Sequence, residues 1–128
     1  MAIDPEHRRL FVGCRNPQKL IVMSADDGKV LADLPIGDGV DATGFDRGDI
    51  FASCRDGSLS VARETAPGKF EIVQNLETKT GSRTMGIDSQ IHAIYLPAAE
   101  FDSPIGEGHR PAMKTGTFKV LAITRTNN

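Results

Sequence analysis

The stretch "FVGCR" at residues 11–15 returns forty residues later as "FASCR" at residues 51–55. Each copy is a short apolar run that ends in a cysteine and an arginine, and short apolar runs between turn residues are typical of buried β-strands. A chain of 128 residues that contains nearly the same strand twice is expected to be built from repeats. The period of the repeat therefore decides the fold.

The repeat period is 42 residues, because three aspartates follow one another at that interval: Asp4, Asp46 and Asp88. Two apolar runs follow each aspartate, and the first two repeats contain a further run after a Gly-Lys turn. The second strands are predicted at residues 9–15, 49–55 and 93–100. The third strands are predicted at residues 19–25, 58–64 and 117–123. The fourth strands, in the first two repeats, are predicted at residues 30–36 and 70–76. We therefore predict a single all-β domain of three repeats, at about residues 1–40, 41–82 and 83–128.

Each repeat is predicted to form one antiparallel four-stranded sheet, which is the unit of a β-propeller blade. Met1 aligns with Thr43 and Met85, in the middle of a blade's first strand. At the other end the chain stops after the third strand of the third repeat. The prediction is a β-propeller fragment of about three blades, the last of which lacks its fourth strand.

The segment "DDGKVLADLPIGDGVDATGFD" at residues 26–46, followed by "IFASC" at residues 50–54, resembles the blades of the bacterial YVTN-repeat β-propeller family. The shared features are the Gly-Lys turn, a run similar to Ile-Pro-Val-Gly, an aspartate and an apolar motif strand. The motif strand itself departs from the Tyr-Val-Thr-Asn form. The resemblance covers almost the full chain and corresponds to the C-terminal three blades. It implies a binding or scaffold role, in a family whose members are often periplasmic or exported.

Three blades cannot close a ring, because propellers contain at least about four. An open arc would expose the apolar faces of its first and last blades. We therefore expect the chain to close the ring by homo-oligomerisation. We expect a homodimer joined head to tail, which gives six blades, in preference to a trimer, which would give nine. The alternative is that the chain is a fragment of a longer propeller, poorly behaved without its missing blades.

The composition is that of a folded globular domain, with 39% hydrophobic and 25% charged residues. The net charge of −2 gives no reason to expect a nucleic-acid partner. The longest aliphatic run, "LIVM" at residues 20–23, is far too short for a membrane span, and the first residues contain no signal-peptide core. As written, the sequence predicts a cytoplasmic protein without a membrane or nucleotide partner.

Several conspicuous residues are assigned structural roles. Asp4, Asp46 and Asp88 stand where the first strand turns into the second, where an aspartate caps its own turn. His7 and His92 are expected at the same end of the sheets, as solvated side chains.

Cys14 and Cys54 occupy the same place in successive repeats, where a small buried apolar residue is expected. A disulfide or a thiol pair that binds a metal is the alternative.

The candidate site is predicted at the opposite end, around the mouth of the channel. The loops that enter the first strands and those that follow the second strands meet there. Carboxylates and one imidazole could hold a divalent ion such as calcium, manganese or zinc at Asp41, Asp56, Glu100 and His109. The third repeat has an insertion in this loop, "FDSPIGEGHRPAMKTG" at residues 101–116, and we expect it to fold over the mouth.

Two functions follow from these residues. One is a scaffold or binding propeller that self-assembles and binds a small ligand or metal at the mouth, where Arg15, Arg55 and Arg83 could hold a small anionic or ester ligand. The other is a metal-dependent hydrolase of esters, lactones, phosphoesters or phosphotriesters, with Glu100 and His109 as its catalytic residues. A third interpretation is that these arginines and aspartates only pair with one another across repeats.

Overall fold

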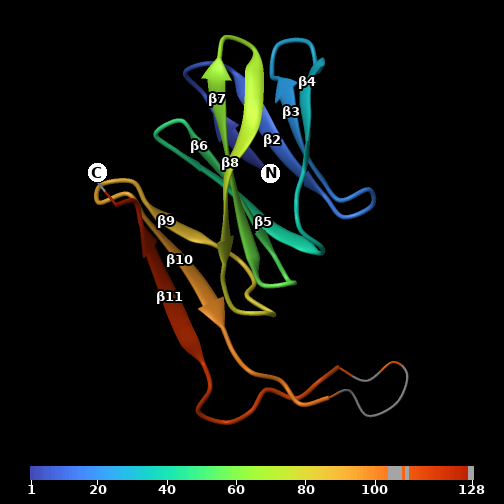
Figure 1. Cartoon of the computed structure of the whole chain (residues 1–128), viewed down its shortest axis with the longest axis vertical. Helices are drawn as coiled ribbons and strands as arrows, with labels where there is room; N and C mark the ends of the chain where they lie inside the picture. The colour runs from blue at the N-terminus through green and yellow to red at the C-terminus, as the bar shows by residue number, and fades with distance from the viewer. Residues whose placement is uncertain (104–107, 109, 127–128) are drawn as a thin grey trace.

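The structure, a computed structural model, describes residues 1–103, 108 and 110–126. These residues form eleven β-strands in three antiparallel sheets (Figure 1). No helix occurs in the described part of the chain, and thus none that could cross a membrane. The predicted all-β class is confirmed.

The sheets follow one another in chain order. The first contains β1 (Ala2–Asp4), β2 (Arg9–Cys14), β3 (Lys19–Ser24) and β4 (Val30–Pro35). The second contains β5 (Val40–Asp46), β6 (Asp49–Cys54), β7 (Ser58–Ala66) and β8 (Lys69–Glu77). The third contains β9 (Gly86–Asp88), β10 (Ala93–Ala98) and β11 (Lys119–Thr124). In each sheet consecutive strands are hydrogen-bonded neighbours, so each is a simple meander with four, four and three strands.

The strand register repeats with the period found in the sequence. In each sheet a small residue of the first strand faces an aromatic residue of the second: Ala2 with Phe11, Gly44 with Phe51, and Gly86 with Tyr95. The small members lie 42 residues apart, as do the three turn aspartates. Residues 42 positions apart in the sequence therefore hold equivalent places in the first strands of the three sheets.

Two apolar cores hold the sheets together. Phe11 and Leu20 of the first sheet pack against Ile50 of the second, and Phe11 stacks on Phe45 at 5.2 Å between ring centroids. On the other face of the second sheet, Phe51 packs against the third. Because the second sheet has a neighbour on both faces, every residue of β6 is buried. This explains why the β6 sequence is apolar or small almost throughout rather than alternating with polar residues.

The cysteines are free thiols. Cys54 is fully buried and packs with Val40 and Ala52, as expected for a small apolar residue. Cys14 is half-buried in the first sheet. Neither the disulfide nor a thiol pair is formed.

The turn prediction is confirmed for two of the three aspartates. Asp4 Oδ1 accepts hydrogen bonds from the backbone N–H groups of Glu6 and His7, and Asp88 Oδ1 accepts them from Gln90 and Ile91. In the first sheet four residues connect Asp4 to its partner Arg9, and in the third sheet four residues connect Asp88 to its partner Ala93.

Asp46 is different, and the turn-capping role predicted for it is wrong. Only Arg47 and Gly48 connect Asp46 to its partner Asp49, and both have positive φ, as in a tight hairpin turn. So short a connection leaves the carboxylate no turn N–H in reach. Asp46 Oδ2 instead lies 2.7 Å from Nδ1 of His92, in the next sheet. His92 is therefore not a freely solvated side chain: it is two-thirds buried and joins two sheets.

Gly44 sets how closely the inner strands approach. A Cβ at this position would lie 2.5 Å from Cδ1 of Ile87 and 2.7 Å from Sδ of Met85, so the ends of these two side chains would have to move to admit a methyl group. We predict that Gly44→Ala lowers the free energy of unfolding by about 1 kcal/mol, the low end of the cost of overpacking, because flexible side-chain ends can give way. The equivalent Gly86 is the control, because a Cβ there meets its nearest atom at 3.9 Å. Urea denaturation should show a measurable loss for Gly44→Ala alone, and equal midpoints for the two variants would contradict this role of Gly44.

Candidate functional site

Asp41, which begins the second repeat, links all three repeats at the predicted mouth. Its Oδ1 lies 3.3 Å from a terminal guanidinium nitrogen of Arg15 and 3.3 Å from one of Arg55. Its Oδ2 accepts a hydrogen bond of 2.9 Å from the backbone N–H of Thr84, which precedes the first strand of the third sheet. Arg15 also donates through Nε to the Val40 carbonyl oxygen at 2.9 Å. Asp41 is therefore a structural centre that ties three sheets together.

The surroundings of Asp41 favour its charged form. Burial has the largest single effect and by itself raises the pKa, but the Thr84 N–H and the Arg55 and Arg15 guanidinium groups outweigh it. The pKa of Asp41 is therefore lowered from its ordinary value. A carboxyl group whose pKa is lowered on folding stabilises the protein above its unfolded pKa and loses that contribution as the pH falls through its folded pKa.

Asp56 has a local structural role. It accepts hydrogen bonds from the N–H of Asp38 at 2.8 Å and from the N–H and hydroxyl of Ser58 at 2.9 and 2.6 Å. Burial alone raises the pKa of Asp56, but these donors lower it overall. Oδ1 thus shapes the turn between β6 and β7, and Oδ2 holds the loop between β4 and β5 against it.

Glu100 lies at the base of the insertion and pairs with Lys79 at 3.1 Å. This hydrogen bond lowers the pKa of the exposed Glu100 carboxyl. The two sides of the insertion pair with each other through Phe101 and Met113 and extend away from the sheets (Figure 1). Arg83 lies over the Phe101 ring, 6.0 Å from its centroid. His109, the other predicted catalytic residue, lies outside the described residues.

The predicted metal ligands are not gathered into one site in the part of the chain that the structure describes. Within it, no three histidine, cysteine, aspartate or glutamate side chains are close enough to hold a metal ion. Asp41 and Asp56 already accept hydrogen bonds from protein donors through both oxygens. For Arg15, Arg55 and Asp41, the arrangement matches the alternative in which the charges pair across repeats.

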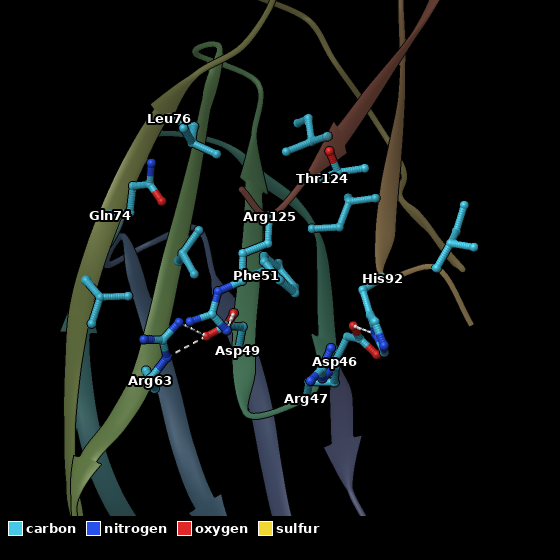
Figure 2. A pocket seen from close by; sticks show the side chains of 15 residues that line it. Asp46, Arg47, Asp49, Phe51, Arg63, Gln74, Leu76, His92, Thr124 and Arg125 are labelled. Atoms are coloured by element: carbon cyan, nitrogen blue, oxygen red, sulfur yellow. Dashed lines mark hydrogen bonds and ion pairs between the residues drawn. The ribbon is translucent and has the colours of Figure 1, made fainter. Parts of the chain in front are cut away.

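Sequence reasoning missed a cleft of about 200 Å³ between the second and third sheets, at the end away from the mouth. Its floor is apolar and is formed by Phe51, Val61, Leu76, Ile94 and Ile123. Figure 2 shows Leu76 and Gln74 at one end of the cleft and the charged side chains around Asp49 and Asp46 at the other.

Two carboxylates organise the charged end of this cleft. Asp49, which is 7% exposed, accepts from Arg63 through Nε at 2.7 Å, and a second guanidinium nitrogen lies 2.6 Å from the same oxygen. Arg125 approaches the other oxygen of Asp49 at 3.7 Å. The sequence contains one signal for this cleft, since Asp49 is a charged residue at the start of a strand whose other residues are apolar or small.

Comparisons with protein-family models and with curated proteins find no match for this chain.

We predict that Asp41→Ala lowers the free energy of unfolding by about 1.5–3 kcal/mol, because it removes a charged acceptor shared by three donors. The control is Asp38→Ala, since the Asp38 side chain accepts only from Gln18 among the described residues and is exposed.

Stability of the parent protein should also fall as the pH drops below about 4, the ordinary range of an aspartate. Asp41→Asn should weaken this dependence. Equal stability of Asp41→Ala and Asp38→Ala would contradict the linking role.

Proposed function

We propose that this protein is a β-propeller scaffold that binds a small ligand and completes its ring with a second copy of itself. The observation that supports it is the character of the two outermost sheet faces. The residues on these outer faces hold the same places in their repeats as the residues that form the two cores between the sheets.

The first sheet has a second apolar face, which points away from the rest of the molecule. Side chains alternate along a strand, so Phe11 faces the core while its neighbours Leu10 and Val12 face outward. Leu10 is paired with Ile3 and Met23, and Val12 with Ile21. Ile3 is 54% exposed and the other four are half-buried.

The third sheet likewise has an outer face. Ile94 and Leu96 point into the second core, so Tyr95 points away from it, with Ala122 and Val120 of β11 on the same side. Val120, the second residue of β11, is 53% exposed, which is uncommon for a valine within a strand.

Within the chain, the same kind of sheet-to-sheet contact occurs twice: between the first and second sheets and between the second and third. The two outer faces are the two halves of a third contact of this kind. Leu10 of the first sheet corresponds to Ile50 of the second and Ile94 of the third, by their places in the aligned strands. Ile50 and Ile94 are both buried against the preceding sheet. A second copy whose third sheet covers Leu10 would repeat this packing. Two such contacts would join six sheets into a ring. Because the contact is heterologous, the ring closes only if the rotation that relates the two copies returns to its starting point.

Binding at the mouth is supported by a cationic group that the ion pairs between the sheets leave available. Arg83 is exposed and forms no ion pair within the described residues. Arg55 is not available in the same way, because its Nε is buried and a terminal guanidinium nitrogen pairs with Asp41. A small anionic ligand could therefore bind at Arg83.

The hydrolase alternative depends on Glu100 and His109 as catalytic residues and on the same two residues with Asp41 and Asp56 as metal ligands. Asp41 and Asp56 are engaged in structural hydrogen bonds through both oxygens, and Glu100 pairs with Lys79, so binding is the better-supported function.

The mass in solution tests the assembly. We expect size-exclusion chromatography with light scattering to give the mass of two chains, and Ala122→Glu or Val12→Glu to give one chain, because each places a carboxylate in the proposed contact. Ala66→Glu, at the exposed last residue of β7, is the matched control and should remain a dimer.

Circular dichroism establishes that each variant is folded. A folded parent protein that stays monomeric at every concentration, or forms a trimer, would rule out the six-bladed ring.

A further inference from the structure

We propose that the cleft between the second and third sheets is a binding site for a small organic carboxylate with a compact apolar body, such as an aromatic or branched aliphatic acid. The cleft lies within a single chain and at the opposite end from the mouth. The proposal therefore does not depend on ring closure or on the mouth site.

The apolar floor determines the body of the ligand. Phe51, Val61 and Ile94 are buried on the facing sides of the two sheets, and Leu76 and Ile123 come from the outer strands β8 and β11. A volume of about 200 Å³ is below the range typical of drug-sized ligands, so the floor suits one ring or one branched chain. Small apolar bodies of this kind gain affinity by leaving water.

The charged end determines the head group. Three arginines line the cleft, Arg47, Arg63 and Arg125, against two carboxylates. Asp49 is bound by Arg63 through two nitrogens, and Asp46 is bound by His92. The cleft thus has more cationic than anionic groups, and an anion is the complementary ligand.

Two of the arginines have donors available for that anion. Arg125 reaches Asp49 only at 3.7 Å, beyond hydrogen-bond distance, and its side chain is 63% exposed. Arg47 forms no ion pair within the described residues. A planar carboxylate can accept two parallel N–H bonds from one guanidinium group, which favours a carboxylate over a more strongly hydrated head group.

The turns place two of these side chains on the cleft. Arg47 has φ of 48° within the two-residue hairpin turn. His92 has φ of 57° at the last position of a four-residue turn, where Arg8 has φ of 55° in the first repeat. Glycine or asparagine is the usual residue in this left-handed region, so an asparagine in place of Arg47 suits the backbone.

Methyl NMR of the protein labelled at isoleucine, leucine and valine tests the proposal, with benzoate as the probe. We expect saturable shifts at Val61, Leu76 and Ile123, and none at Leu20 or Val22 in the other core. Benzamide, which has the same ring without the charge, should bind about tenfold more weakly, the effect of one charge-assisted hydrogen bond. Inorganic phosphate should cause little shift at these methyl groups.

Matched variants identify the residues that recognise the charge. Arg47→Asn and Arg125→Gln should each weaken benzoate binding about tenfold. Arg8→Asn is the control, since Arg8 also has a positive φ of 55° but pairs with Asp26 and does not line the cleft. Arg47→Asn should keep or raise the melting temperature, because asparagine tolerates this conformation better, so a loss of binding cannot be attributed to unfolding.

Three results would overturn the proposal. Equal shifts with benzamide would show an apolar cavity that does not recognise charge, and equal shifts with phosphate would show a simple anion site. No saturable shift at millimolar benzoate, or unchanged affinity in both arginine variants, would show that the cleft does not bind carboxylates in this way. Val12→Glu should bind benzoate like the parent, which separates failure of the ring from failure of this site.

Discussion

The structure depends on one packing constraint: a sheet of this sequence has two apolar faces and must cover both. The second sheet has a neighbour on both faces and β6 is buried along its whole length, although Val73 of its outer strand β8 stays 42% exposed. Each outer sheet satisfies the constraint on one side only. The constraint is strictest at the inner strands, where Gly44 allows β5 to approach Met85 and Ile87 of the next repeat. Larger residues can be accommodated toward the outer strands, where the sheets have more space between them.

Polar contacts between the sheets add specificity to this apolar packing. At the mouth, Asp41 binds groups from all three repeats, so it fixes how the repeats are rotated relative to one another. At the other end, Asp46 and His92 connect only the second and third. Apolar faces of similar shape could slide over one another at little cost, whereas partly buried charges lose their partners when they shift. The charged residues therefore select one arrangement among several that would bury comparable apolar area.

Most of the fold could be predicted from the sequence because its signals are local. The repeated runs at residues 9–15 and 49–55 correspond to β2 and β6 within one residue. The partner of Asp46 could not be predicted in this way. It depends on a hairpin with two connecting residues instead of four, and on a histidine in the next repeat. The predicted mouth did bring Arg15, Arg55 and Asp41 together, but residue type alone does not tell whether such groups bind a ligand or one another.

The location of the cleft follows from the packing constraint itself. Sheets that meet closely at their inner strands and are twisted diverge toward their outer strands. Between the first and second sheets the outer strands β4 and β8 meet, whereas the described third sheet ends at β11, so Leu76 of β8 and Ile123 of β11 line an open wedge. The apolar residues that would meet across a narrower gap instead form a floor. Charged residues can stand at its edge, because water still reaches them there. An apolar cleft is thus a consequence of how these sheets pack, whereas its cationic rim depends on Arg47, Arg63 and Arg125, and these residues determine what it can bind.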